Sequence, residues 1–236
     1  FTEPGRLHAT YNFDLLEHGG LTVSEMKEAI SNAIELFNGT GKLCFAFSNH
    51  DVPRSASRQL SPLGITLDKQ DDLQLLLLQL ETSLIGSSCI YQGEELGLSD
   101  VTNIQFDKMK DPWGLNFYPE FLGRDTCRTP MVWEKNKPMG GFTSANEAWL
   151  PISELHMEKA GLDMAKSEGS IYNKFSSFLK WRRKQPAMIS SNKMSELSGG
   201  LREIIFDRES ETQILRCKFD FELVKATFEE VTHGTS

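Results

Sequence analysis

Three consecutive polar residues, Asn49, His50 and Asp51, carry side chains that can bind hydroxyl groups or transfer a proton. They follow residues 42–48, a short run of apolar, aromatic and small residues. Such a run predicts a buried strand of a parallel sheet. Because enzymes built on parallel barrels carry their active sites at the carboxyl ends of the strands, we predict that the three polar residues lie at a functional site.

Two later segments also bring charged residues together. Residues 89–97 form a second short apolar run that leads into Glu94 and Glu95, and residues 123–133 contain Arg124 and Arg128. In this order, the three segments resemble the second half of an α-amylase-superfamily glycoside hydrolase. They are most similar to its α-glucosidase branch, which includes the oligo-1,6-glucosidases. The resemblance extends over about residues 6–219.

The resemblance implies an α/β fold in two parts. Residues 1–186 are expected to form the C-terminal part of a (β/α)8 TIM barrel, and residues 187–236 the start of a β-sheet C-terminal domain. Barrel strands six, seven and eight are expected at residues 7–16, 42–48 and 88–91. Residues 92–169 hold five prolines and three tryptophans without clear periodicity. They predict a long loop after strand eight, whose length favours a role in substrate binding.

Helical periodicity predicts three helices beside these strands. Thr22 and Glu25 have the spacing of a capping box, which places the start of the first helix. The second helix is expected at about residues 68–85, and the third at residues 170–184, ended by Pro186. Residues 52–67 predict an irregular loop in which Arg54 and Arg58 are solvated. Strands are expected at residues 201–206 and 212–219.

By the resemblance, Asp51 is the third carboxylate of the family's active site, which stabilises the transition state. His50 then hydrogen-bonds hydroxyl groups of the same sugar ring, and Asn49 braces the pair. Retaining cleavage also needs a nucleophilic and a protonated carboxylate about 5–5.5 Å apart. In the family these two follow the fourth and fifth strands, and nothing in this sequence corresponds to them. We therefore expect the chain alone to be inactive.

The other candidate residues each have two interpretations. Either Glu94 or Glu95 reaches the substrate pocket, or one is exposed and the other pairs with an arginine. Arg124 and Arg128 resemble arginines near the family's pocket entrance, where they would hold a sugar hydroxyl; alternatively they form structural ion pairs, with Asp125 as a local partner. The aromatic residues of the long loop either stack on sugar rings or give the loop its own core: Trp113, Phe117, Tyr118, Phe121 and Trp133.

The composition is that of an ordinary globular chain, with 39% hydrophobic residues and a formal charge of −8. The negative charge argues against a nucleic-acid or anionic-membrane partner. No apolar run has the length of about 18–20 residues that a membrane span requires. The four single cysteines lack metal-binding spacing. We therefore expect no metal, no cofactor and a cytoplasmic protein with free thiols.

The predicted activity is retaining hydrolysis of terminal α-linked glucose from short oligosaccharides or sucrose, within carbohydrate metabolism. The alternatives are a trehalose synthase or sucrose-active transglycosylase relative, a catalytically inactive fragment, and a non-enzymatic interaction protein of the same family. Because the chain begins at Phe1 rather than Met, we expect residues upstream of it. The N-terminal half of the barrel would come from those residues or from a partner chain; otherwise we expect self-association.

Overall fold

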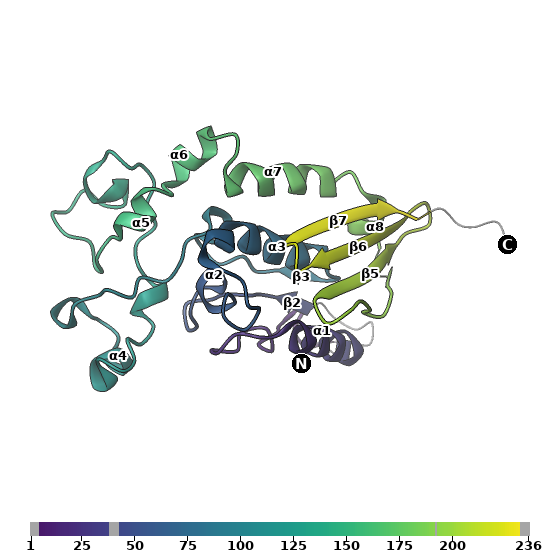
Figure 1. The fold of residues 1–236 in the computed structure, drawn as a ribbon, viewed down its shortest axis with the longest axis horizontal. Helices are drawn as coiled ribbons and strands as arrows, with labels where there is room; N and C mark the ends of the chain where they lie inside the picture. The colour runs from purple at the N-terminus through teal and green to yellow at the C-terminus, as the bar shows by residue number, and fades with distance from the viewer. Residues whose placement is uncertain (1–4, 38–42, 192, 232–236) are drawn as a thin grey trace.

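The computed structural model describes residues 5–37, 43–191 and 193–231, which form two sheets with their helices (Figure 1). The first sheet is parallel, with the strand order β1 (Thr10–Tyr11), β2 (Leu43–Phe45) and β3 (Ser87–Ser88). The second is antiparallel, with the strand order β4 (Lys193–Met194), β5 (Glu203–Glu209), β6 (Ile214–Asp220) and β7 (Lys225–Glu230). An α/β part thus precedes a β-rich part.

The parallel strands alternate with helices. α1 (Val23–Phe37) follows β1, and α3 (Gln70–Ser83) follows β2. At the start of α1, the backbone N–H of Thr22 donates to the Glu25 carboxylate at 2.7 Å, and that of Glu25 donates to the Thr22 hydroxyl at 3.3 Å. This is the predicted capping box. Because helices join parallel strands, the carboxyl ends of all three strands meet at one edge of the sheet.

The three parallel strands are shorter than the apolar runs that predicted them. The predicted strand at 42–48 is β-paired only over Leu43–Phe45, Lys42 lies outside the described residues, and β3 ends at Ser88. Residues 46–48 remain buried after the pairing ends. At residues 46–48 the apolar pattern therefore marks burial rather than strand pairing, whereas residues 87–89 around β3 are exposed. Among the described strands, β1 and β3 each have one neighbour, so their outer edges carry no ladder.

The predicted irregular loop at residues 52–67 contains a helix, α2 (Ser55–Arg58), and leads into the short helix η1 (Leu67–Lys69). Four residues are too few to show helical periodicity. Here the turn is fixed by tertiary contacts instead, because the backbone N–H of Ser55 donates to the Ser48 hydroxyl at 2.8 Å.

The long segment 92–169 is not structureless as predicted, since a series of short helices punctuates it. Each has three to six residues, which is too short for an apolar stripe to reveal it. They are η2 (Glu94–Leu96), η3 (Phe106–Lys108), α4 (Pro112–Phe117), η4 (Asp125–Cys127), η5 (Pro138–Gly141), α5 (Glu154–Met157) and α6 (Gly161–Lys166). In Figure 1 α4, α5 and α6 lie away from the two sheets, whereas η2 packs against α3 and α7 (Ile171–Arg182).

The predicted third helix is α7 (Ile171–Arg182), which the Ser170 hydroxyl caps by accepting from the backbone N–H of Asn173 at 3.1 Å. α7 ends before Pro186, and that proline opens the next helix, α8 (Pro186–Ile189). Proline suits the first helical position because the N–H it lacks would have no partner there. Pro186 therefore starts a helix instead of stopping one.

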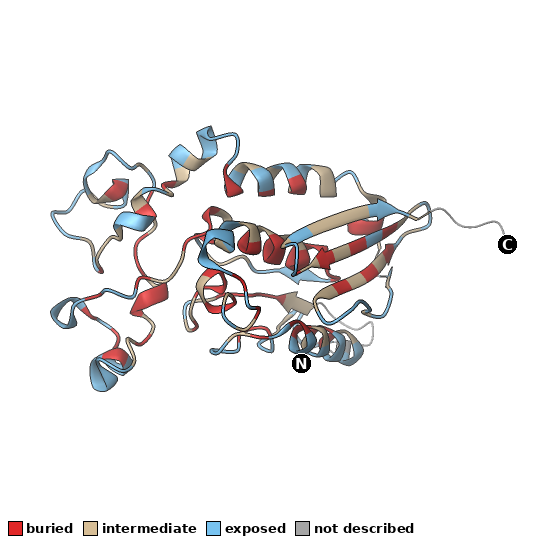
Figure 2. Cartoon of the chain, viewed as in Figure 1, coloured by how far each residue is buried: buried red, intermediate tan, exposed pale blue. Residues whose placement is uncertain are grey.

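The two sheets share one hydrophobic core. Phe45 of β2, Met26 of α1 and Leu77 of α3 belong to the same buried cluster as Phe206 of β5 and Phe219 of β6. In Figure 2 the buried residues line the inner faces where α3 meets the antiparallel sheet. The β-rich part thus packs directly on the helices of the α/β part. Within the described residues, none of the helices is both long and apolar enough to cross a membrane.

Candidate active site

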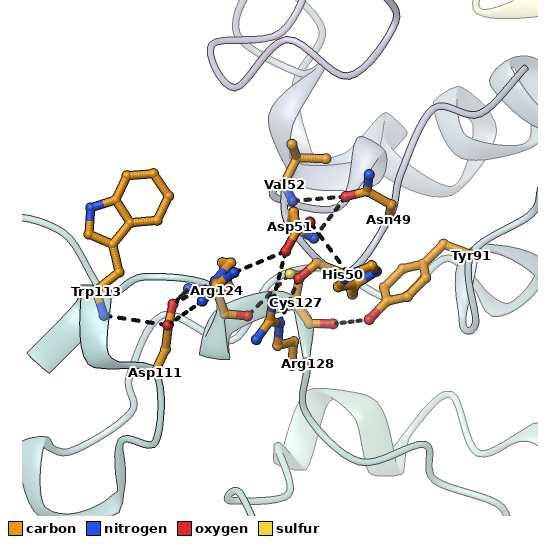
Figure 3. Close-up of polar contacts among 10 residues, drawn as sticks. All are labelled: Asn49, His50, Asp51, Val52, Tyr91, Asp111, Trp113, Arg124, Cys127 and Arg128. Carbon is orange, nitrogen blue, oxygen red and sulfur yellow. Dashed lines mark hydrogen bonds and ion pairs between the residues drawn. The ribbon is translucent and has the colours of Figure 1, made fainter. Parts of the chain in front are cut away.

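Asn49, His50 and Asp51 lie just beyond β2, at the edge where the parallel strands end (Figure 3). The Asn49 amide oxygen accepts hydrogen bonds from the backbone N–H groups of Asp51 at 2.8 Å and Val52 at 3.1 Å. This local turn fixes the backbone that carries the other two side chains. His50 Nε2 lies 3.4 Å from Asp51 Oδ2, and the two side chains are 67% and 48% exposed.

Two arginines from the long segment converge on Asp51 (Figure 3). Arg128 Nη2 donates to Asp51 Oδ1 at 2.8 Å, and Arg124 Nη1 reaches the same oxygen at 3.2 Å. Burial acts to raise the pKa of Asp51, but the charge of His50 and the hydrogen bonds from both arginines outweigh it, so the pKa is lowered. Asp51 is therefore ionised at neutral pH.

Arg124 has a second carboxylate partner, Asp111. Its Nε and Nη2 donate to Asp111 Oδ2 and Oδ1 at 3.0 and 2.8 Å. The prediction that Asp125 is the local ion-pair partner of the arginines was wrong. Asp125 Oδ2 instead accepts from the backbone N–H groups of Lys110 at 2.6 Å and Asp111 at 2.9 Å. Asp125 is next to Arg124 in the sequence, but it starts the turn η4, which directs its carboxylate away from the neighbouring arginines.

Glu94 lies beneath the site and is 1% exposed. One of its oxygens accepts from the hydroxyls of Ser48 at 2.8 Å and Ser55 at 2.7 Å, and the other from the backbone N–H of Tyr91 at 2.8 Å. Ser48 directly precedes the Asn49–Asp51 turn. Glu94 therefore connects the carboxyl ends of β2 and β3, and its oxygens are engaged within the protein.

Glu95 points to another part of the molecule. One of its oxygens accepts from the backbone N–H of Gly93 at 2.8 Å, and its side chain lines a depression with Tyr172, Phe175 and Lys180 of α7. Burial raises the pKa of its carboxyl. No hydrogen bond or ion pair joins Asp51 to Glu94 or Glu95 among the residues that the structure describes.

Arg54, which we expected to be solvated, is completely buried. Its guanidinium donates to the backbone oxygens of Gln92 at 2.6 Å and Cys127 at 3.1 Å and lies 5.1 Å from the centre of the Tyr91 ring. It thereby ties the loop after β2 to the loop after β3 and to the segment that carries Arg128. The sequence gives no sign of this, because the two acceptors and the Tyr91 ring lie 37 to 73 residues away.

Arg58 was also wrongly expected to be solvated. Its Nη2 donates to the backbone oxygens of Leu15 at 3.1 Å and Phe47 at 2.6 Å, and its Nη1 to that of Pro53. Burial lowers the pKa of Arg58 to about 10, so it still carries its charge at neutral pH. Arg58 thus joins the segment after β1 to the end of the run that leads into Asn49.

The aromatic residues of the long segment are mostly exposed. Trp113 is 47% exposed, and its ring meets Phe121 edge-on at 5.3 Å between centroids. Phe117, Tyr118 and Trp133 are also exposed. In Figure 3, Trp113 stands beside the Asp111–Arg124 pair. These rings are available to a ligand, and stacking on a sugar stays a prediction.

The arrangement offers an ionised, half-exposed carboxylate among hydrogen-bond donors. Such a group can accept hydrogen bonds from hydroxyls and stabilise positive charge that develops nearby. The neighbouring carboxylates are engaged elsewhere, Asp111 with Arg124 and Glu94 with the two serines. In the described residues, no group of three or more His, Cys, Asp or Glu side chains could hold a metal ion.

Comparison with known proteins places this chain in a family. A model of the α-amylase catalytic domain matches residues 8–191. A probable α-glucosidase of Rhizobium meliloti is 40% identical over 183 residues, which cover 78% of this chain and 32% of the relative. An oligo-1,6-glucosidase of Halalkalibacterium halodurans is 26% identical over 185 residues, covering 72% and 32%. The chain thus spans about a third of the length of these curated relatives.

Solved structures show the same fold. The α-glucosyl transfer enzyme XgtA is 33% identical with a TM-score of 0.78, covering 93% of this chain and 39% of that one. A trehalose-6-phosphate hydrolase of Bacillus licheniformis is 22% identical with a TM-score of 0.79, covering 93% and 44%. The chain therefore belongs to the α-amylase family, and its curated relatives include α-glucosidases and oligo-1,6-glucosidases.

Proposed function

We propose that this chain is the Asp51-bearing part of a retaining α-glucosidase that releases terminal α-linked glucose from short oligosaccharides or sucrose. The observation that carries the proposal is the ionised, half-exposed Asp51 at the carboxyl end of a parallel strand, with His50 at 3.4 Å and two arginines on its other oxygen. The 40% identity to a probable α-glucosidase supports the reaction class.

In this proposal Asp51 accepts hydrogen bonds from hydroxyls of the sugar ring that is cleaved. As the glycosidic bond breaks, the ring flattens and gains oxocarbenium character. A fixed carboxylate stabilises that positive charge more strongly than it stabilises the neutral substrate, which accelerates the reaction. His50, Arg124 and Arg128 supply N–H donors for the same ring, while Asn49 holds the turn.

Glu94 takes the role of a positioning residue in this proposal, because its oxygens hold Ser48 and Ser55 under the turn. Glu95, which lies against α7, takes no part in sugar binding. The nucleophile and the acid come from the rest of the barrel, since the carboxylates nearest Asp51 are engaged with Arg124, Ser48 and Ser55. The partner that completes the site is therefore the N-terminal half of the same barrel.

Transglycosylation is the second candidate function. It is favoured by the solved structure of XgtA, an α-glucosyl transfer enzyme that is 33% identical to this chain. Hydrolysis and transfer share the covalent glycosyl-enzyme intermediate and differ in whether water or a second sugar accepts the glucosyl group.

The test is to express the complete polypeptide, including residues upstream of Phe1, and to follow its reactions with an aryl α-glucoside, maltose, isomaltose and sucrose by NMR. A retaining glucosidase releases the α-anomer of glucose first, whereas a transglycosylase builds longer or isomeric saccharides. Release of the β-anomer first, or no turnover of any α-glucoside, would contradict the proposal.

A further inference from the structure

Arg124 divides its guanidinium between two carboxylates. Nε and Nη2 form a two-point pair with Asp111, at 3.0 and 2.8 Å, and Nη1 reaches Asp51 at 3.2 Å. The backbone N–H of Arg124 also donates to Asp111, at 2.7 Å. A two-point arginine–carboxylate pair fixes the orientation of the guanidinium plane. The contact with Asp111 therefore determines where the remaining nitrogen of Arg124 points.

Asp111 is itself held firmly. Its side chain is fully buried, its backbone N–H donates to Asp125 at 2.9 Å, and its carboxylate caps α4 through the N–H of Trp113 at 3.4 Å. The hydrogen bond from Arg124 keeps the pKa of Asp111 well below its usual range, so this carboxylate stays charged. Asp51 is half-exposed by contrast. Among the three hydrogen-bonded side chains of Asp111, Arg124 and Asp51, the buried carboxylate of Asp111 is thus the most firmly held.

We propose that Asp111 is a positioning residue for the active site, which acts through Arg124 to hold the carboxylate of Asp51 in one orientation. This role deepens the proposed function and rests on it for its catalytic consequence. A long arginine side chain loses rotational freedom when it is held in one geometry. Asp111 supplies that ordering before a substrate arrives, so that binding energy need not be spent on it.

The substitution Asp111→Asn separates positioning from simple charge, because the two effects have opposite signs. If Asp111 acts only through its negative charge, removing that charge lowers the pKa of Asp51 further. If Asp111 positions Arg124, the guanidinium is released, Asp51 loses a hydrogen bond, and its pKa rises. Asparagine is also a good N-cap, so α4 keeps its start.

The experiment labels the aspartate carboxyl carbons of the complete polypeptide, including residues upstream of Phe1, and follows Asp51 by NMR titration. We expect the pKa of Asp51 to rise in Asp111→Asn and in Arg124→Gln, with no further rise when both substitutions are present. The matched control is Asp207→Asn, which removes a similar two-point pair, with Arg216 at 2.9 and 2.9 Å, on the antiparallel sheet. It should leave the pKa of Asp51 unchanged.

A lowered or unchanged pKa of Asp51 in Asp111→Asn, in a protein whose thermal unfolding shows that it is folded, would overturn the positioning role. In the complete enzyme, Asp111→Asn should lower kcat/KM by about tenfold to a hundredfold, as expected for a misplaced catalytic group. Wild-type kcat/KM in that variant would also overturn it. The pKa of Asp51 could rise in Asp111→Asn while the complete wild-type enzyme cleaves no α-glucoside. In that case the proposed function is wrong, but the positioning of Arg124 by Asp111 is supported.

Discussion

Arg128 binds both the side chain of Asp51 and the backbone of His50. Its Nη2 donates to Asp51 Oδ1 at 2.8 Å, and its Nε donates to the carbonyl oxygen of His50 at 2.6 Å. One side chain from the segment after β3 therefore fixes two features of the turn after β2. The site is built jointly by the loops that follow two neighbouring strands, and neither loop contains it alone.

Asp51→Asn should abolish most of the turnover of the complete enzyme. Losing one electrostatic contact that forms mainly in the transition state commonly costs on the order of 10²–10³-fold in rate. The measurement is kcat on an aryl α-glucoside, with circular dichroism to show that the fold is kept. Asp207→Asn serves as the control and should turn over normally. A near-wild-type kcat in Asp51→Asn would refute the role of this residue.

The 236-residue chain on its own should not cleave α-glucosides. Covalent catalysis needs a nucleophile and an acid together, and the carboxylates around Asp51 are engaged with Arg124, Ser48 and Ser55. The measurement is release of an aryl group by purified chain at high enzyme concentration. Turnover that disappears on Asp51→Asn would show that the chain holds a complete site.

The isolated chain should also associate with itself. The outer edges of β1 and β3 are unpaired within the described residues, and near β1 the side chains of Leu7 and Phe13 are 61% and 67% exposed. Open strand edges and exposed apolar side chains favour pairing with other chains. Sedimentation velocity over a range of concentrations measures this directly. A well-dispersed monomer at high concentration would contradict the prediction.

Arg54→Met should destabilise the fold more than an ordinary surface change. It removes a buried charge that binds two backbone oxygens, Gln92 O and Cys127 O, and leaves them without that donor. Leaving a buried hydrogen-bonding group without its partner costs about 1–3 kcal/mol. Lys69→Met is the control, since its pair with Asp72 at 3.4 Å is exposed and worth about 0–1 kcal/mol. Chemical denaturation of both variants gives the comparison. Equal free energies of unfolding for the two variants would show that the hydrogen bonds of Arg54 do not stabilise the fold.

His156 should make the chain less stable as the pH falls below about 6.5. Burial lowers its pKa from 6.5 to about 4, so the unfolded chain takes up a proton in this range and the folded chain does not. Stability from the neutral ring is complete above pH 6.5 and is lost as the pH falls to about 4. The slope for one proton is at most about 1.4 kcal/mol per pH unit. His156→Gln should lose this slope in denaturation measured across that range. An unchanged slope would contradict it.

Sequence reasoning located the turn at Asn49–Asp51 and the capping box at Thr22 because both are local. A polar cluster after an apolar run, or two residues three apart, can be seen without knowing the fold. The positions of Asp111 and Arg54 could not be found this way. Asp111 followed by proline indicates only a helix start, and its arginine partner lies 13 residues further on.

Burial was also misjudged where charge was taken as a sign of exposure. Arg54 and Arg58 are both buried because each is surrounded by backbone oxygens of other segments. A charged side chain is buried when its partners are in place, and these partners assemble only in the folded chain. The strand at residues 42–48 was predicted too long for a different reason, since its residues 46–48 stay buried after strand pairing ends at Phe45.

The contact between Arg128 and Asp51 also imposes an order in time during synthesis. The two residues are 77 positions apart, so at about 5–20 residues per second the ribosome makes Arg128 roughly 4–15 s after Asp51. Until Arg124 and Arg128 are made, the nascent chain carries the Asn49–Asp51 turn without the two arginines that bind Asp51. A chain whose synthesis stops before Arg124 would therefore contain the whole of β2 but neither arginine of the site.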